Sequence, residues 1–148
     1  MVMWHDLLSI PWKLHGTDRS GMDCSTLAEE VLRRTGATPP ESSPYRAANR
    51  AGEEGEIESF LSSLEAGFDR IGSVVSDATK TGDLVLACDE HGMARHLYVL
   101  VEPSRGTFLT ATHTQGVRSM RRGQIATMNR FMTHSISGVY RIAGGCPC

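Results

Sequence analysis

Gly21-Met22-Asp23-Cys24-Ser25-Thr26-Leu27 is a short turn that places a cysteine in the first turn of a predicted amphipathic helix. Asp23 is a suitable N-cap residue and Gly36 a suitable C-terminal stop, so this helix is expected to span about residues 24–35. Backbone N–H groups at a helix start stabilise a thiolate and lower the pKa of a thiol. Free cysteines are more often buried structural residues, but this turn-and-cap setting favours Cys24 as a nucleophile.

The second half of the chain changes from helical periodicity to the alternation that is typical of strands. Two further helices are expected at residues 3–10 and 56–66, and a loop at residues 12–21. Strands are expected at residues 83–88, 95–102, 107–112, 116–118 and 137–142. Helices that precede a run of strands favour an α+β domain with an antiparallel sheet.

His96, in the strand-like run Ala94–Val101, is the candidate base that would act on Cys24. Strand alternation places His96 and Tyr98 on one face of the sheet and Leu97 on the other. A histidine on a strand is usually just a half-buried polar residue. From this position, however, a base could face a cysteine packed against the sheet, and that pairing favours the catalytic interpretation.

A third group should bond the other ring nitrogen of His96 and hold the imidazole in place. A hairpin near residues 103–106 brings residues 110–113 opposite His96. Thr110 has the better register, whereas His113 is chemically the better partner but needs a bulge to reach the same face. We expect His113 in this role, with Thr110 as the alternative.

Length and charge limit the possible function classes. The chain has 148 residues and a formal net charge of −2, which fits one domain and gives no support for nucleic acid as a partner. No run of sequence is long and apolar enough for membrane insertion. The N-terminus lacks a basic start and a continuous apolar run, so no signal peptide and synthesis in the cytoplasm are expected.

The cysteines and histidines do not form a recognisable metal-binding pattern. Cys146-Pro147-Cys148 at the C-terminus lacks two convincing further ligands. Cys24, His96 and His113 have the side-chain chemistry of zinc ligands, but the sequence has no CxxC or HExxH pair that would support a zinc site. The sequence therefore predicts neither a metal site nor a cofactor.

Taken together, the motifs resemble the NlpC family of cell-wall cysteine peptidases, which belongs to the papain-like superfamily. The family pattern runs Pro-Tyr-x-Trp-Gly-Gly, Gly-x-Asp-Cys-Ser-Gly-Leu, Gly-Asp-Leu-Val, a strand that begins with His, and a hairpin to a polar residue. The matching segments, in order, are Pro11-Trp12-Lys13-Leu14-His15-Gly16, Gly21–Leu27, Gly82-Asp83-Leu84-Val85, His96–Val101, Phe108–Thr112 and Val139-Tyr140-Arg141.

This resemblance implies a papain-like α+β domain whose N-terminal helices pack on a central antiparallel sheet of about five to six strands. A single domain would span residues 1–148, with a core at about 8–142 and a tail at 143–148. It also implies amide hydrolysis through a thioester, with Cys24 as nucleophile and His96 as base. The family substrate is a peptide bond beside D-glutamate in bacterial peptidoglycan stem peptides.

Several positions depart from the family pattern around the cleft. Trp12 replaces a tyrosine, Thr26 and His15 replace glycines, and Thr110 stands where histidine is frequent. These changes affect the expected substrate without removing the Cys–His pair. The residues expected to line the substrate-binding cleft are Trp12, His15, Asp23, Ser25 and Thr110.

Two other functions fit the same residues. An acyltransferase or deamidase would use the same thioester but resolve it with another acceptor. A structural module of a phage tail or secretion assembly would keep the Cys–His pair without using it. Small stand-alone domains of this type resemble those encoded with phage tail genes, so action at the cell wall or in a phage or prophage tail, with tail proteins as partners, is a further expectation.

Overall fold

A computed structural model of the protein describes residues 2–13, 16–39, 67–92 and 94–143. Six strands form one antiparallel sheet in the order β3-β8-β4-β5-β6-β7. They are β3 (Phe68–Gly72), β4 (Leu84–Cys88), β5 (Ala94–Glu102), β6 (Thr107–Thr112), β7 (Gly116–Arg121) and β8 (Ser135–Ile142). A separate small hairpin pairs β1 (Thr17–Asp18) with β2 (Gly21–Met22). The α+β papain-like architecture is therefore confirmed.

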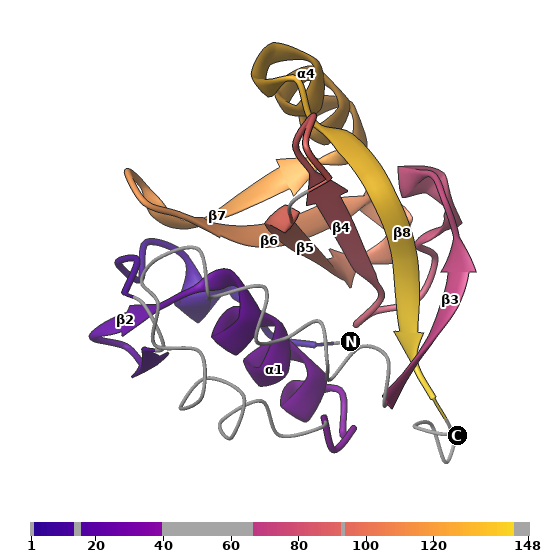
Figure 1. Ribbon diagram of the computed structural model, residues 1–148. Coiled ribbons are helices and arrows are strands. Elements are labelled where there is room, and N and C mark those ends of the chain that lie inside the picture. Colours follow the sequence, from indigo (N-terminus) through magenta and orange to yellow (C-terminus); the bar gives the residue numbers. More distant parts are fainter. Residues whose placement is uncertain (1, 14–15, 40–66, 93, 144–148) are drawn as a thin grey trace.

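Two helices cover opposite faces of this sheet (Figure 1). On one face α1 (Cys24–Arg34) buries Leu27 and Val31 against side chains such as Leu97. On the other face α4 (Arg122–Met132) buries Ile125 in a cluster with Tyr98. Successive strand residues point to opposite faces, so neighbours in β5 divide between the two apolar clusters. The central strands are consequently buried on both sides.

The N-terminal segment runs along the edge of the sheet formed by β7. It begins with a short 3₁₀ helix, η1 (His5–Leu7). Ser9 donates its N–H to the Val117 carbonyl oxygen at 2.9 Å, and the Val117 N–H donates to the Ile10 carbonyl oxygen at 2.8 Å. Gly116 has a φ of +69°, and a Cβ there would lie 2.2 Å from the Ile10 carbonyl oxygen. Only glycine allows this close approach.

Several expectations are confirmed and others are wrong. The helix expected at 24–35 spans Cys24–Arg34, and each expected strand is present, the fourth extended from 116–118 to Gly116–Arg121. The helix expected at 3–10 forms only η1, because Ser9 has a φ of +68° and Pro11 follows. The loop expected at 12–21 contains β1 and part of β2. The helix expected at 56–66 lies outside the described residues.

One strand of the large sheet and one α-helix were not expected, and the helix interrupts the predicted order of helices followed by strands. β3 pairs with β8 at one edge, and α4 lies between β7 and β8. Ile125 and Asn129 are the buried residues of α4, while Phe131 is 89% exposed. Ile125, Met128 and Met132 are nevertheless at helical spacing, so the sequence does carry a short apolar stripe here, which was not recognised.

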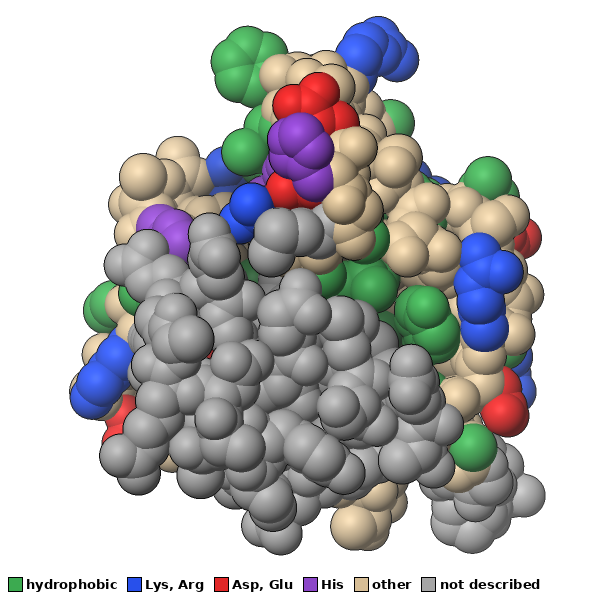
Figure 2. Space-filling model, in the orientation of Figure 1, with side chains coloured by type: hydrophobic (Ala, Val, Ile, Leu, Met, Phe, Trp, Pro, Cys, Tyr) green, Lys and Arg blue, Asp and Glu red, His purple; other side chains and the backbone are tan. Residues whose placement is uncertain are grey.

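The surface of the described residues carries mixed charge. Lys, Arg, Asp and Glu side chains are scattered over the described part of the face in Figure 2, without one large single-sign patch there. Within the ranges that the structure describes, no helix has both the length and the apolar character needed to cross a membrane.

Asp83 anchors the turn before β4 to the neighbouring strand β8. Its carboxylate accepts two hydrogen bonds from Arg141, at 2.7 and 2.8 Å, and one each from the Thr79 and Lys80 N–H groups at 2.9 Å. Asp83 is 1% exposed. A buried carboxylate with this many donors fixes both chain segments. The aspartate of the Gly-Asp-Leu-Val motif is thus structural.

Replacing Asp83 with alanine is expected to lower the free energy of unfolding by about 2–3 kcal/mol, because it leaves the Arg141 charge and two turn N–H groups unpaired. Arg141 is partly exposed, which keeps the effect below that of a fully buried pair. Urea denaturation measures the change. Asp18→Ala, at an exposed aspartate bonded to Ser20, is the matched control and should cost under ~1 kcal/mol. Equal losses for the two variants would contradict the anchoring role.

Candidate active site

The turn before α1 is held by a network around Asp23. The Asp23 carboxylate accepts from the Thr26 N–H at 2.9 Å and from the Ser25 hydroxyl at 2.8 Å. The Thr26 hydroxyl oxygen in turn accepts from the Asp23 N–H at 3.0 Å. This is a complete N-cap, and it fixes Cys24 as the first residue of the helix. Asp23 and Ser25 are both fully buried within it, so their contribution to a substrate cleft stays a prediction.

The Cys24 thiol lies where β5 and β6 stop pairing. Pairing begins at the turn between the two strands and stops at Val99 of β5 and Leu109 of β6. Beyond them the thiol donates to the Ala111 carbonyl oxygen at 3.1 Å and lies 3.8 Å from the Thr110 hydroxyl oxygen. The Thr110 hydroxyl donates to the Leu97 carbonyl oxygen at 3.0 Å, in place of a backbone bond between the strands. Cys24 therefore lies against β6 at the point where its pairing with β5 stops, and it is 2% exposed.

His96 approaches this opening from the other face of the sheet. It is paired with Ala87 and shares the α4 face with Tyr98, whose ring centroid is 6.0 Å away. The predicted alternation is confirmed, but α1 packs on the opposite face, beside Leu97. Burial raises the pKa of the Tyr98 hydroxyl, and the nearby Cys24 raises that pKa further. Cys24 and His96 thus approach the β5–β6 opening from opposite faces.

The environment of His96 favours the neutral imidazole. Burial is the main cause that lowers the pKa of His96 from 6.5 to about 4, and the positive charges of His134, His113 and Arg95 act in the same direction. The Nδ1 atom is buried, without a hydrogen-bond partner among the described residues. A neutral ring with a free nitrogen can accept a proton at pH 7.

The structure brings His113 and Trp12 to the same region. The two rings meet edge to face with centroids 4.0 Å apart, and the charge of His113 reaches His96. Trp12 is positioned by a parallel bridge to Met22, just ahead of the Cys24 turn. His15, the other residue expected in this loop, lies outside the described residues.

His134 is a further residue at the site, and no pattern in the sequence singled it out. Its ring centroid is 5.4 Å from that of His96, and its Nδ1 is also buried without a partner in the described part of the chain. The end of α4 places it there: Thr133 adopts the left-handed conformation, and the His134 N–H donates to the Asn129 carbonyl oxygen at 2.7 Å. No local motif could have shown this, because α4 itself was not expected.

The described residues contain no group of three or more His, Cys, Asp or Glu side chains placed to hold a metal ion. Cys88, at the end of β4, is a second free cysteine and is half-buried.

NMR titration is expected to find the His96 ring changing charge near pH 4. The pKa is lowered in the folded state, so the unfolded chain takes up this proton first as the pH falls below 6.5. The contribution of His96 to stability is thus complete above pH 6.5 and is lost as the pH falls through about 4. Spectra of His96→Gln identify the resonance. Titration near 6.5 would show that the ring is not buried as described.

Comparison with known proteins supports the same family as the motifs. The model of the NlpC/P60 family matches residues 9–137. No curated protein matches the chain. Among solved structures, the crystal structure of an NlpC/P60 family protein from Bacillus cereus ATCC 10987 is similar, with a TM-score of 0.56 and 17% identity. The match covers 91% of this chain but 36% of that protein, so the chain spans about a third of its length, and the likeness is one of fold.

Proposed function

Because the chain belongs to the NlpC/P60 family, a family of papain-like cell-wall peptidases and amidases, we propose that it hydrolyses an amide bond in peptidoglycan stem peptides through a Cys24 thioester. The observation that carries this proposal is the Cys24 thiol at the first turn of α1, inserted at the β5–β6 opening that His96 approaches from the other face. A helix start and a neutral histidine are the two parts that a cysteine nucleophile needs.

The reaction would begin when the thiol leaves the Ala111 carbonyl and passes its proton to His96. The sulfur then attacks the carbonyl carbon of the scissile amide and forms a tetrahedral oxyanion. The Cys24 N–H, at the positive end of α1, would donate to that oxygen. His96 returns the proton to the leaving amine, which departs and leaves a thioester, and water then releases the acid and the free thiol.

His113 is the residue that we place in the orienting role. Its ring meets that of Trp12 edge to face, and it lies close enough to help lower the pKa of His96. His96 Nδ1 has no hydrogen-bond partner among the described residues, so the orienting bond would form only after the His113 ring moves. The Thr110 hydroxyl hydrogen is already donated to Leu97, so Thr110 is better placed to hold the strand ends around the thiol. His113→Ala should therefore reduce kcat more than Thr110→Val does. The reverse order would assign the role to Thr110.

Substrate binding would involve the wall that Trp12 and His113 form. Trp12 cannot supply the hydroxyl of the family's tyrosine, but its indole gives a flat apolar surface. Asp23 and Ser25 would act by shaping the turn, and His15 is proposed from the sequence alone. Because Cys24 is 2% exposed, neighbouring groups must move before a substrate carbonyl reaches the sulfur.

Mass spectrometry of purified stem peptides incubated with the protein tests this function. Hydrolysis gives two fragments whose masses together equal the substrate plus one water. A conjugate with an added amine would instead support the acyltransferase alternative, and a product one mass unit heavier would support a deamidase. Intact peptides would contradict the peptidase proposal and favour a structural module. The phage-tail role rests on resemblance alone, and no feature of the described residues bears on it.

A further inference from the structure

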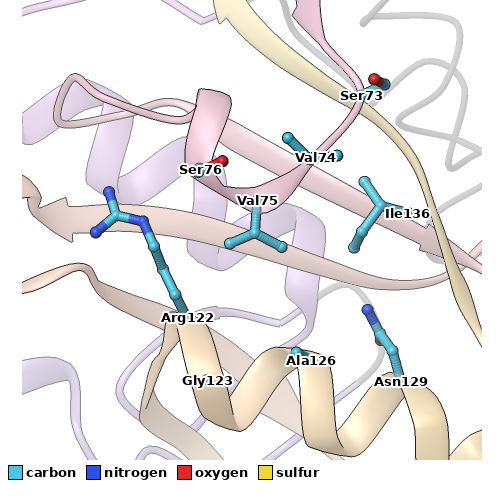
Figure 3. A pocket seen from close by; sticks show the side chains of 9 residues that line it. All are labelled: Ser73, Val74, Val75, Ser76, Arg122, Gly123, Ala126, Asn129 and Ile136. Atoms are coloured by element: carbon cyan, nitrogen blue, oxygen red, sulfur yellow. The ribbon is translucent and has the colours of Figure 1, made fainter.

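The helix α4 has two flanks beside its buried stripe, and they differ in what lies next to them. Figure 3 shows one flank, where Arg122, Ala126 and Asn129 line a pocket opposite the 3₁₀ helix η2 (Val75–Asp77). The other flank borders β7, and an open groove of about 500 Å³ lies between the two elements. Neither Cys24 nor His96 lines this groove, so the β7 flank is a separate surface.

The groove and its rim are lined mainly by large, flexible apolar side chains. They are Met120 from β7 and Met128, Phe131 and Met132 from α4. Phe131 is 89% and Met132 is 45% exposed. The described residues expose four large hydrophobic side chains in all, and these two are the only neighbours among them. Adjoining exposed apolar groups mark an interaction surface, whereas single ones are ordinary.

Charge on this flank has one sign. Glu102 is the last acidic residue of the chain, and residues 103–148 carry six arginines and no lysine, although the whole chain has a net charge of −2. Arg118 lines the groove and donates to the neutral side chain of Gln115. Arg130 is exposed in the last turn of α4, and within the described part of the chain neither arginine forms an ion pair. Their charges therefore remain available to an anionic partner.

The end of α4 is a projecting tip rather than an enclosed pocket. α4 lies at the top of Figure 1, on the opposite side of the sheet from α1. Over α4, Figure 2 shows one hydrophobic and one Lys or Arg side chain projecting beyond the rest, with the acidic side chains of this face below them. The helix ends at Met132, and Thr133 turns the chain back toward β8 in the left-handed conformation. A projecting tip of this kind can insert into a soft partner but cannot enclose a small ligand.

We propose that the β7 flank of α4 binds the surface of an anionic phospholipid bilayer. Phe131 and Met132 would enter the boundary of the acyl chains, while Arg118 and Arg130 would meet the headgroup phosphates. A second copy of the chain fits less well, because it would place arginine opposite arginine. A soluble polyanion would satisfy the arginines but leave the apolar tip in water. The surface does not involve Cys24, so it can be tested whether or not the protein is a peptidase.

Co-sedimentation of the intact protein with lipid vesicles tests the proposal. The probe is a vesicle of equal parts phosphatidylglycerol and phosphatidylcholine, and a vesicle of phosphatidylcholine alone is its control. We expect at least ~10-fold tighter binding to the anionic vesicle, because two arginines contribute near a charged surface. Raising the salt from ~0.05 M to ~0.5 M should weaken this binding at least ~5-fold. Equal binding to the two vesicles, or none to either, would overturn the proposal.

Phe131→Ser locates the apolar part of the surface. The side chain is 89% exposed, so the Tm should not fall, while binding to the anionic vesicle should weaken at least ~10-fold. Met3→Ser is the matched control, because Met3 is 81% exposed in the N-terminal segment, and it should bind within about 3-fold of wild type. Full binding by Phe131→Ser would overturn the bilayer as partner and favour a soluble polyanion.

Arg130→Gln locates the charged part. We expect about 5-fold weaker binding to the anionic vesicle and a smaller effect of salt. Arg33→Gln removes the same charge from α1, on the opposite face of the sheet, and should bind within about 2-fold of wild type. Equal losses in Arg130→Gln and Arg33→Gln would show that only net charge matters, and would overturn the assignment to this flank.

Discussion

Replacing Cys24 with alanine is expected to reduce kcat/KM on peptidoglycan stem peptides by at least ~10³-fold, because no other group can form the thioester. The fold should survive. The Asp23 cap does not use the sulfur, and the change removes weak contacts of the thiol with the Ala111 carbonyl and the Thr110 hydroxyl. We expect the free energy of unfolding to fall by about 1 kcal/mol. Product formation by mass spectrometry and urea denaturation of the same preparation measure the two effects.

Cys88→Ala is the matched control, since it removes the other free thiol of the described residues. Cys88 ends β4, pairs with Ala94 and has no part in the proposed reaction. This variant should keep its activity within about 3-fold of wild type. An active Cys24→Ala protein would eliminate the cysteine mechanism, whereas loss of activity in both variants would point to a general loss of structure.

His96→Gln is expected to lower kcat by about 10²–10⁴-fold, the usual contribution of a general acid–base group. Glutamine fills a similar volume and can still form hydrogen bonds, but it cannot accept the thiol proton at neutral pH. The acid limb of the wild-type pH–kcat/KM profile should report the His96 pKa of about 4. That limb should be absent in the residual activity of the variant.

His91→Gln makes the same change at an exposed turn between β4 and β5, where the ring lies 3.8 Å from the Glu90 carboxylate. It should leave both kcat and the pH profile unchanged. If His96→Gln kept its rate and its acid limb, the base would have to be another group, and His134 would be the first candidate because its ring lies 5.4 Å away.

Helices and strands could be predicted from the sequence where a local residue pattern determines their position. The turn around Cys24 combines an N-cap, an apolar stripe and a stop, so α1 could be placed almost to the residue. Short apolar and β-branched runs likewise placed β4, β5 and β6, and the two-residue period of a strand placed His96 and Tyr98 on one face. The family motifs then linked these segments in the right order.

The rest of the site depends on contacts between distant segments, for which a single sequence gives no signal. α4 has apolar residues at helical spacing (Ile125, Met128 and Met132), but this short pattern between two strands was not recognised, and with α4 the position of His134 was also missed. The break in pairing between β5 and β6 is another example. It brings Cys24 and His96 toward one opening from opposite faces, and strand alternation alone could not show it.

The pairing of the N-terminal segment with β7 has a consequence for the order of folding. Ser9 and Ile10 bond to Val117, so the contact joins parts of the chain that are about a hundred residues apart. A growing chain therefore carries this segment unpaired until β7 has been synthesised. Trp12 follows directly in the chain, so its contact with His113 also forms late. Cys24, the proposed nucleophile, is synthesised early, but its contact with Ala111 forms only when most of the polypeptide has left the ribosome.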